Sequence, residues 1–489
     1  MPNQNVGSHR EVHRDVPEGV PGGLFGGVFA RGGPVADDAA WLRAMLAAEA
    51  GLARALERAG LAPPGAGAAV TAAAARADDL DIAELSWSSA LTGNPVPGLA
   101  RALTRLVADP EARAAVHHGA TSQDIMDTAA MLLARDAIDA ALADLSRAGD
   151  AAARLADSHR GSLMIGRTLL QQAVPVTFGV VAAGWLSGVD AAIAGLVSVR
   201  DTRLAAQFGG AAGTLASLGA DGPRVKALLA REVGLADPPL PWHTERLRII
   251  DVATAMTRVT ATLGKVARDV TLLAQTEVGE VSEGTGGTGM PPTEGAGAAA
   301  PRRGGSSAMP NKNNPVAAVA ILGCARQVPG LLATLVASAE QEHQRAAGAW
   351  HAEWQPLSHL LELAVSAAAW SRDLLEHLQV DTGRMAANLA AANGYPLAER
   401  VTAVLRDALG APRAHDVVAN AAARAASSGV PLRDVLLAAP ELEGAVITSD
   451  QIDQALDPSG YLGASGDFIT AALAAHERLE DGKERSADE

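Results

Sequence analysis

The stretch Gly305-Ser306-Ser307-Ala308-Met309-Pro310-Asn311-Lys312-Asn313-Asn314-Pro315 decides how this chain is interpreted. Two serine hydroxyls and a lysine lie in a segment that glycine makes flexible and that Pro310 and Pro315 restrict at two later points. Asn314 before Pro315 is the pattern of an N-cap and a first helical residue, so the segment is predicted to lead directly into a helix. Backbone N–H groups at a helix start, with a cation beside them, favour an anion-binding site.

An ordinary surface loop with a helix cap is the alternative interpretation of the same residues. The lysine counts against it, because the chain contains only four lysines among its 40 basic residues. Lys312 is therefore interpreted as a functional residue.

The same stretch resembles the signature G-S-S-x-M-P-x-K-x-N-P of the fumarase/aspartase superfamily, with every fixed position matched. In that family the loop carries the general base, which is the first serine of the pair, and it closes over a dicarboxylate. The resemblance implies that Ser306 is the base and that Lys312 and Asn314 hold a substrate carboxylate. It also implies that Met309 lines the site.

Composition bounds the fold and excludes several kinds of partner. Of the 489 residues, 48% are hydrophobic but only 3% are aromatic, so alanine, leucine and valine must fill the core. An interior of this kind favours closely packed long helices over a β-sandwich. The net charge of −15 argues against nucleic-acid binding, for which clustered basic residues are expected. An anionic substrate therefore needs locally placed cations.

The chain contains one cysteine, Cys324, which has no internal disulfide partner and is interpreted as a small buried hydrophobe. This cysteine usage fits a reducing, cytoplasmic setting. The first residues, to position 23, lack the apolar stretch of a signal peptide. Charge or proline interrupts every apolar span of about 20 residues, so no membrane helix is expected.

Helical periodicity runs through most of the chain. The segment 36–61 repeats apolar residues at helical spacing and stops at Gly60. Longer apolar segments follow at 121–159, 175–200, 246–283 and from Pro315 past Pro329. Such lengths predict an all-α, three-part chain with a long central helical bundle. Helices that are apolar on several sides predict partner chains.

The expected division of the chain follows these segments. It comprises a disordered leader (1–23), an N-terminal helical domain (24–115), a central long-helix bundle (116–370), a C-terminal helical domain (371–476) and a charged tail (477–489). The central bundle includes the signature loop at 284–314, whose first part is too poor in large apolar residues to pack. That first part is interpreted either as a mobile extension of a lid or as a plain linker.

The first long helix is preceded by a second block, V-H-H-G-A-T-S-Q-D, which ends at Asp124. Thr121 with Asp124 three residues later is a capping-box pattern, which by itself explains the block. The block also resembles the superfamily motif H-x-G-x-T-S-x-D, whose threonine and serine hydrogen-bond a substrate carboxylate at the helix N-terminus. The resemblance therefore implies that Thr121 and Ser122 bind substrate. Whether His117 or His118 contacts the ligand stays open.

A third block begins at Arg167 and reads R-T-L-L-Q-Q-A. It resembles the adenylosuccinate lyase motif R-T-H-G-Q-P-A, whose histidine acts as general acid, and Leu169 stands at the place of that histidine. An amine leaving group needs a proton, whereas a carboxylate or nitrite can leave as the anion, so this departure favours a good anionic leaving group. Gln171 remains a substrate-binding candidate, and Arg31 is a candidate for a second anion contact.

Four further blocks resemble the 3-carboxy-cis,cis-muconate cycloisomerase branch of the superfamily. They are Gln207-Phe208-Gly209-Gly210, Pro241-Trp242-His243-Thr244, Gln275-Thr276-Glu277-Val278-Gly279-Glu280 and Trp350-His351-Ala352-Glu353-Trp354. That branch commonly carries M-P-H-K-R-N-P, where this chain has Asn311 and Asn313. Loss of a cation beside the loop weakens binding of a tricarboxylate more than of a dicarboxylate.

The resemblance implies an elimination lyase. No metal and no other cofactor is expected, since the sequence has no H-E-x-x-H, no paired cysteines and no nucleotide-binding glycine turn. The favoured reaction is elimination from nitrosuccinate to fumarate and nitrite, with cycloisomerisation of 3-carboxy-cis,cis-muconate as the alternative. A catalytically silent structural relative is a remote alternative, against which the intact serines, threonine and lysine argue.

The resemblance also implies how the chain assembles. A homotetramer is expected, in which the Thr121, Gln171 and Ser306 blocks of one site come from three subunits. The expected partners are a small di- or tricarboxylate and other copies of the chain, with neither nucleic acid nor a membrane.

Overall fold

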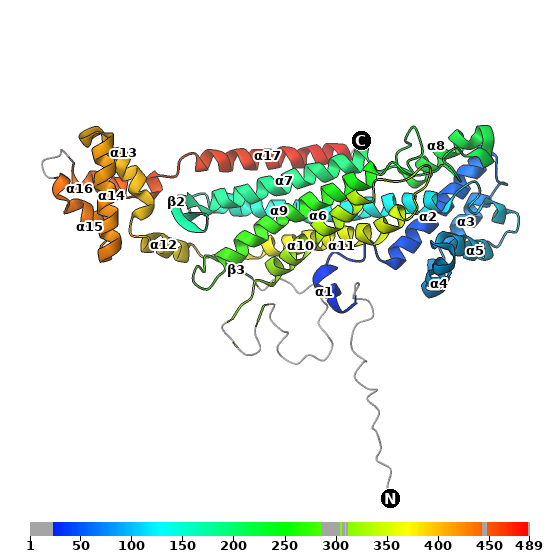
Figure 1. The fold of residues 1–489 in the computed structure, drawn as a ribbon, viewed down its shortest axis with the longest axis horizontal. Helices are drawn as coiled ribbons and strands as arrows, with labels where there is room; N and C mark the ends of the chain where they lie inside the picture. Colours follow the sequence, from blue (N-terminus) through cyan, green and yellow to red (C-terminus); the bar gives the residue numbers. More distant parts are fainter. Residues whose placement is uncertain (1–22, 285–303, 306–308, 310–311, 443–446, 488–489) are drawn as a thin grey trace, which may run out of the picture. The chain divides into compact units, whose positions relative to one another are not determined.

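Helices make up most of the computed structural model, which describes residues 23–284, 304–305, 309, 312–442 and 447–487 (Figure 1). The α-helices are α1 (Gly26–Phe29), α2 (Asp38–Ala59), α3 (Ala66–Ala74), α4 (Ile82–Thr92), α5 (Val96–Leu106), α6 (Ser122–Ser158), α7 (Phe178–Thr202), α8 (Gly222–Val233), α9 (Leu247–Leu273), α10 (Val316–Ala337), α11 (Ala349–Glu376), α12 (Thr382–Ala391), α13 (Ala398–Leu409), α14 (Ala411–Ser428), α15 (Leu432–Leu437), α16 (Ser449–Ala455) and α17 (Ser465–Ala487). Short 3-10 helices are η1 (Gly23–Phe25), η2 (Ala77–Asp79), η3 (Ala112–Ala115), η4 (Ala216–Asp221), η5 (Tyr395–Leu397), η6 (Pro440–Leu442) and η7 (Pro458–Gly460).

The predicted all-α class is confirmed, and the strands of the described residues form only two small antiparallel sheets. One is the hairpin of β1 (Leu163–Thr168) and β2 (Gln171–Thr177). The other pairs β3 (Val281–Glu283) with β4 (Leu378–Val380), two segments far apart in the sequence. Residues 1–22 of the predicted leader lie outside the described residues, and Gly23 is the first residue of η1.

Two compact units divide the chain, and each is assembled from separate stretches of sequence. The first comprises Met1–Ala140, Arg200–Ala253 and Val328–Ala367. The second comprises Ala141–Val199, Thr254–Gln327 and Ala368–Glu489. The five-part division expected along the sequence stays a prediction.

The core of the first unit forms around α2. Asp37 caps this helix by accepting a hydrogen bond from the N–H of Ala40 at 2.8 Å. The helix ends at Gly60, as the sequence predicted, and this residue has the left-handed conformation at φ 78°. The helix packs against α3 and α8. Gly51 permits the close approach to α8, since a Cβ at this position would lie 2.6 Å from Cγ1 of Val233.

In the second unit, two predicted helical segments contain strands. The segment at 175–200 begins as β2 and becomes helical only at Phe178, whose N–H donates to the carbonyl of Ser162 at 2.9 Å. The segment at 246–283 leaves the helix after Leu273, because the chain folds back and the N–H of Glu280 donates to the Leu273 carbonyl at 2.9 Å. Gly279, at φ 63°, supplies the conformation that this reversal needs.

Two described helices, α7 and α10, are long and apolar enough to span a bilayer by length and composition, with mean hydropathy of 1.8 and 1.6. Core helices of helical bundles have the same character. Each carries an interruption, Asp190 in α7 and Pro329 in α10. In the single chain 44% and 33% of their most apolar windows are buried, which leaves apolar surface on both helices. The expected absence of a membrane span stays a prediction.

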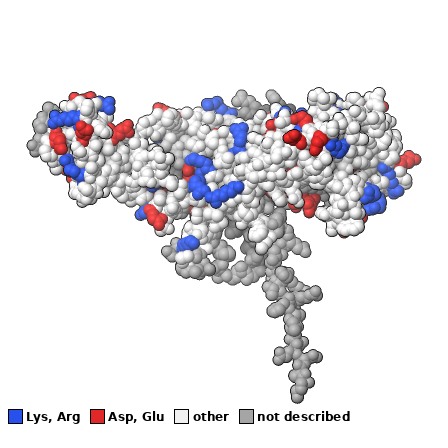
Figure 2. Space-filling view, viewed as in Figure 1, with Lys and Arg blue, Asp and Glu red and all other residues white. Residues whose placement is uncertain are grey.

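Charges of both signs are interspersed on the face shown in Figure 2, and uncharged residues cover most of that face. This distribution gives the visible face no continuous basic surface, in keeping with the net charge of −15. Positive charge for an anionic substrate must therefore come from individual side chains and helix starts.

Candidate active site

Asp124 organises the start of α6, where the second sequence block lies. Its side chain is buried, and its Oδ2 accepts hydrogen bonds from the N–H groups of Thr121 and Gly210, both at 2.9 Å. Its Oδ1 accepts from the N–H of Gly209 at 2.8 Å. The bond to Thr121 is the Asp124 half of the predicted capping box. The carboxylate therefore fixes the backbone that precedes the helix and is not itself directed at a ligand.

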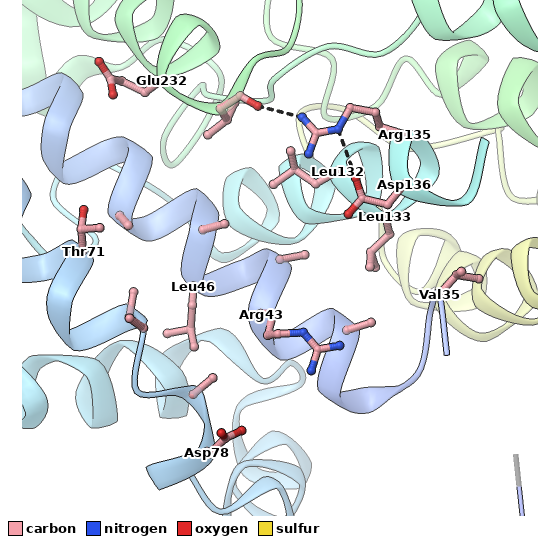
Figure 3. A pocket seen from close by; sticks show the side chains of 18 of the residues that line it. Val35, Arg43, Leu46, Thr71, Asp78, Leu132, Leu133, Arg135, Asp136 and Glu232 are labelled. Atoms are coloured by element: carbon pink, nitrogen blue, oxygen red, sulfur yellow. Dashed lines mark hydrogen bonds and ion pairs between the residues drawn. The ribbon is translucent and has the colours of Figure 1, made fainter. Parts of the chain in front are cut away.

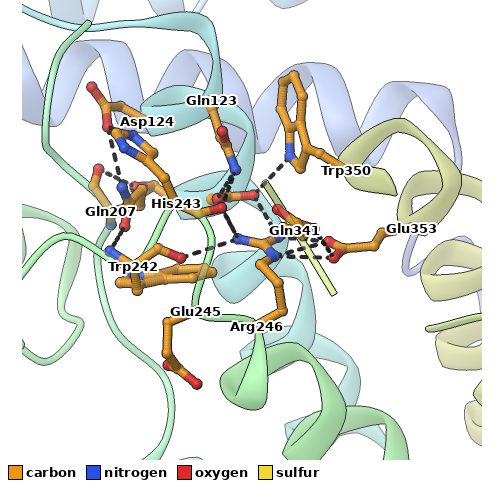
Figure 4. A network of polar contacts seen from close by, with 12 residues as sticks. Gln123, Asp124, Gln207, Trp242, His243, Glu245, Arg246, Gln341, Trp350 and Glu353 are labelled. Carbon is orange, nitrogen blue, oxygen red and sulfur yellow. Dashed lines mark hydrogen bonds and ion pairs between the residues drawn. The ribbon is translucent and has the colours of Figure 1, made fainter. Parts of the chain in front are cut away.

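His243 completes the coordination of this carboxylate (Figure 4). Its Nε2 lies 2.7 Å from Asp124 Oδ1, and its side chain is 4% exposed. A carboxylate oxygen can only accept a hydrogen bond, so the proton between the two atoms is assigned to Nε2 of the imidazole. Close packing maintains this geometry, because a Cβ on Gly209 would lie 2.8 Å from Cε1 of His243.

A buried ion-pair network continues from the same helix face (Figure 4). Nη1 of Arg246 lies 2.7 Å from Asp127 and its Nη2 lies 2.6 Å from Glu353, with each of these side chains at most 3% exposed. Burial raises the pKa of Glu353, and the charge of Arg246 opposes this rise. Trp350 Nε1 donates to the Asp127 carboxylate at 3.1 Å. The three blocks that contain Gly209, His243 and Trp350, which resemble the cycloisomerase branch, thus hold the start of α6 in place.

The fourth of those blocks ends at Glu280, which is fully buried and binds Arg167. The two guanidinium nitrogens lie 2.9 and 2.7 Å from the two carboxylate oxygens, which is a bidentate pair. Asn388 donates to the same carboxylate at 2.8 Å. Arg167 of the third block therefore anchors the β1–β2 hairpin.

The turn of that hairpin consists of Leu169 and Leu170, at φ 51° and 64°. The left-handed conformation costs a non-glycine residue about 1–2 kcal/mol. Gln171 follows directly, is exposed, and lines a hollow of about 480 Å³ together with Tyr395 and Glu399. The substrate-binding candidate is thus accessible, in a segment that the Arg167 ion pair holds.

Asn314, at the end of the signature loop, is tied to Gly304, which directly precedes the signature stretch that begins at Gly305. Both the backbone N–H and the side-chain Nδ2 of Asn314 donate to the carbonyl of Gly304, at 2.8 and 3.0 Å. Lys312 is exposed, and its N–H donates to the carbonyl of Met309 at 3.0 Å. The proposed base, Ser306, lies outside the described residues.

The helix that follows this loop spans Val316–Ala337, and the Pro315 carbonyl accepts the first helical hydrogen bond from the N–H of Val319 at 2.9 Å, so the predicted helix start is confirmed within one residue. Its first amides are not open to a ligand, because the buried carboxylate of Glu283 accepts from the N–H groups of Ala317 and Ala318 at 3.0 and 2.8 Å. A carboxylate at a helix N-terminus is favourable for the same reason that a bound anion would be. The predicted anion site at this helix start is therefore filled by the chain itself.

The remaining candidates of the second block have unequal surroundings. His117 contacts the fully buried Glu49, with its N–H at 2.9 Å and its Nδ1 at 2.7 Å from the carboxylate. Burial alone lowers the pKa of His117, but the hydrogen bond and charge of Glu49 outweigh it and raise the pKa. His118 is exposed, whereas Thr121 and Ser122 are half-buried.

The candidate residues fall into the two compact units. Thr121 and Ser122 are adjacent in the first unit, which also contains Arg31, whose backbone N–H donates to Ser366 Oγ at 3.2 Å. Gln171 belongs to the second unit. So do the described residues of the signature loop, Met309, Lys312 and Asn314.

A separate hollow of about 790 Å³ in the first unit contains none of the candidate residues (Figure 3). Its walls are mainly alanine and leucine from α2, α3 and α6, and Arg135 at its edge pairs with Asp136 at 3.2 Å. Among the residues that the structure describes, no group of three or more His, Cys, Asp or Glu side chains is arranged to hold a metal ion.

Comparison with known proteins finds relatives over nearly the whole chain. A family model described as lyase matches residues 36–330, and one described as adenylosuccinate lyase C-terminus matches residues 394–472. Nitrosuccinate lyase of Streptomyces davaonensis is 44% identical over 90% of this chain and 92% of that protein. The 3-carboxy-cis,cis-muconate cycloisomerase of Bradyrhizobium diazoefficiens is 43% identical over 90% of this chain and 95% of that protein.

A solved structure shows the same fold. The 3-carboxy-cis,cis-muconate lactonizing enzyme from Pseudomonas putida superposes with a TM-score of 0.84 at 38% identity, covering 94% of this chain and 99% of that chain. The chain is therefore an enzyme of the fumarase/aspartase superfamily of lyases, in the branch that contains the 3-carboxy-cis,cis-muconate cycloisomerases and nitrosuccinate lyase.

Proposed function

We propose that this enzyme converts nitrosuccinate to fumarate and nitrite by β-elimination, without a metal or organic cofactor. The Ser306 alkoxide removes a proton from the carbon next to one carboxylate, giving an aci-carboxylate. The electron pair then forms the carbon–carbon double bond as the carbon–nitrogen bond breaks, and nitrite leaves as the anion. The proton remains on Ser306 until solvent accepts it.

Positive charge near the loop is needed for this step, because a serine hydroxyl becomes an effective base only when its alkoxide is stabilised. Glu283 occupies the first amides of α10. Lys312 is therefore the group that supplies charge to the alkoxide and to the aci-carboxylate. Asn314 and the loop amides assist it.

The second carboxylate of the substrate is assigned to the start of α6. Thr121 and Ser122 present hydroxyls there, next to helix amides that carry partial positive charge. The buried bonds of Asp124 keep this segment rigid, which favours tight positioning of a charged ligand. Gln171 and Met309 complete the lining, and Arg31 provides a second anion contact.

The choice of leaving group rests on Leu169. An alkyl side chain cannot protonate a leaving amine, so the site suits an anion that departs without a proton. Both nitrite and the carboxylate of a lactone meet this requirement. Asn311 and Asn313 replace the histidine and the basic or polar residue common in the cycloisomerase branch. Because a cation beside the loop is lost, a dicarboxylate is favoured over a tricarboxylate as the substrate.

Cycloisomerisation of 3-carboxy-cis,cis-muconate is the second candidate. It is supported by the 43% identity to the Bradyrhizobium cycloisomerase and by the TM-score of 0.84 to the Pseudomonas putida enzyme. The identity to this cycloisomerase nearly equals the 44% identity to nitrosuccinate lyase, so overall similarity does not separate the two reactions. We therefore rank nitrosuccinate elimination first on the basis of the two asparagines of the loop.

We also infer that the enzyme works as a cytoplasmic homotetramer, with the Thr121, Gln171 and Ser306 blocks of each site contributed by three subunits. The apolar surface left on α7 and α10 in a single chain supports association. Light scattering combined with an activity assay tests this inference. Activity should be confined to the tetramer, and a fully active monomer would refute it.

A paired assay tests the substrate. Purified enzyme is given nitrosuccinate, with nitrite measured by colorimetry and fumarate by absorbance, and separately 3-carboxy-cis,cis-muconate, with loss of muconate absorbance measured. Nitrite and fumarate in equal amounts, with the higher kcat/KM on nitrosuccinate, are expected. Rapid loss of muconate absorbance without nitrite release would reverse the order of the two candidates and make the two asparagines neutral changes.

A further inference from the structure

The turn between β1 and β2 holds two leucines in a conformation that leucine avoids. Pairing of Thr168 with Gln171 leaves only Leu169 and Leu170 in the loop, and both have positive φ, at 51° and 64°. Positive φ at both positions defines a type I′ turn, for which Asn-Gly, Asp-Gly and Gly-Gly are strongly preferred. A leucine Cβ crowds the following carbonyl oxygen in this conformation, so each leucine strains the folded chain.

Packing within the chain does not compensate for this strain. Leu169 is 95% exposed and Leu170 is 73% exposed, whereas Met164 and Ile165 on the same hairpin are buried. Two apolar side chains in water and two strained backbone positions therefore coincide in one turn. Strain of this kind persists where the local structure serves a function, because otherwise residues suited to the turn would be more stable.

The turn adjoins the candidate substrate-binding residue. Gln171 follows Leu170 directly and lines the hollow of about 480 Å³ that Tyr395 and Glu399 border. The bidentate pair of Arg167 with Glu280 fixes the strand that leads into the turn. The leucines are thus held in a defined place at the same end of the hairpin as Gln171.

We propose that Leu169 and Leu170 are specificity-determining residues, an apolar pair that contacts the carbon skeleton of the bound dicarboxylate and excludes water from the reacting carbon. This proposal rests on the proposed function for the placement of Gln171 at the substrate. Excluding water keeps the alkoxide base directed at the carbon-bound proton and strengthens the electrostatic contacts to the substrate. The strained turn is then a case of stability given up for activity.

Two double variants of the full-length enzyme separate strain from apolar contact. Leu169→Asn/Leu170→Gly relieves the strain and removes the apolar pair, whereas Leu169→Met/Leu170→Met keeps both. The Asn/Gly variant is expected to unfold about 1–3 °C higher than the wild type. Its kcat/KM should fall about tenfold or more. The Met/Met variant should keep kcat/KM within about twofold of the wild type, since the volume and apolarity are conserved.

Leu240→Asn is the matched control, because Leu240 is also 73% exposed but is not among the residues with positive φ. It should change neither the unfolding temperature nor kcat/KM. The single variants Leu169→Asn and Leu170→Gly are measured in the same way and replace the double variant if it does not fold.

Activity is measured with whichever of nitrosuccinate and 3-carboxy-cis,cis-muconate the wild type turns over faster. A failure of the proposed function, seen as turnover of muconate alone, therefore leaves this test intact. A higher unfolding temperature with unchanged kcat/KM would overturn the proposal, because the leucines would then have no part in the site. A lower unfolding temperature would also overturn it, because the substitution of residues suited to the turn would then have relieved no strain.

Discussion

His243 Nε2 lies 2.7 Å from Asp124 Oδ1 inside the first unit, and both side chains are almost completely buried. The same carboxylate accepts hydrogen bonds from the backbone N–H of Thr121, three residues before it, and from those of Gly209 and Gly210, which are distant in the sequence. A buried carboxylate with every oxygen occupied by donors is a rigid support. We interpret it as the part that keeps the Thr121–Ser122 segment in position for substrate.

Replacing Asp124 with Asn should therefore reduce both stability and activity. The new amide group places a donor against backbone N–H donors, which leaves buried groups unsatisfied at a cost of about 1–3 kcal/mol. The displaced Thr121 segment should lower kcat/KM by about a hundredfold. Chemical denaturation and steady-state kinetics measure the two effects. Wild-type kcat/KM in a destabilised variant would show that Asp124 supports the fold alone.

Removal of Arg246 should be strongly destabilising. In Arg246→Met, the buried carboxylates of Asp127 and Glu353 lose the cation that lies 2.7 and 2.6 Å from them. Breaking a buried ion pair in this way costs about 3–5 kcal/mol. Burial already raises the pKa of Glu353, so the carboxyl should take up a proton as the pH falls, which partly restores the variant.

The check for this prediction is the free energy of unfolding of both proteins between neutral and mildly acidic pH. The gap between wild type and Arg246→Met should narrow as the pH falls. A gap independent of pH would contradict the account of Glu353. Arg433→Met is a control, because Arg433 pairs with Asp453 on the surface, where loss of an ion pair has little effect on stability.

His476 should make stability depend on pH through its two carboxylate partners. On α17 it lies 2.9 Å from Asp190 of α7 and 3.2 Å from Asp150 of α6, and Glu480 adds a further negative charge. Burial alone lowers the pKa of His476, but the hydrogen bond and the charge of Asp190 outweigh it, and the pKa is raised above 6.5. Because the folded pKa is raised, the stabilisation is complete below the unfolded pKa and is lost as the pH rises through the folded pKa.

The His476→Gln variant tests this sign. Relative to the variant, the wild type should be most stable in mildly acidic solution and should lose that advantage as the pH rises above 6.5. Denaturation curves at a series of pH values give the difference in the free energy of unfolding between the wild type and the variant. His117 is present in both proteins, so its own pH dependence cancels in this difference. An advantage that grows with pH would contradict the charged state assigned to His476.

Local patterns were sufficient to predict parts of this structure. The end of α2 was predicted from Gly60, whose preference acts within one turn of helix, whereas the cap by Asp37 was not predicted. The all-α class followed from segment length and from an alanine-rich composition. The candidate site residues were identified by motif, and their roles stay predictions.

Features that depend on distant contacts were not predictable from the sequence. The cap of α10 comes from Glu283, which lies 34 residues before Ala317, and nothing in its neighbourhood marks it as a helix cap. The β1–β2 hairpin was missed because Leu-Leu is a poor turn sequence. His243 and Arg246 act through partners more than 100 positions away. The block that contains His243 could be noticed in the sequence, but the contacts of neither residue could be inferred from it.

The central claim is that Ser306 is the base of an elimination reaction. Its most direct test is the turnover of Ser306→Ala beside that of Ser307→Ala, with substrate binding measured separately by calorimetry. Ser306→Ala should lose about three or more orders of magnitude in kcat while binding the substrate with nearly wild-type affinity, and Ser307→Ala should keep far more activity. Near-normal turnover of Ser306→Ala would contradict the account and assign the base to another residue.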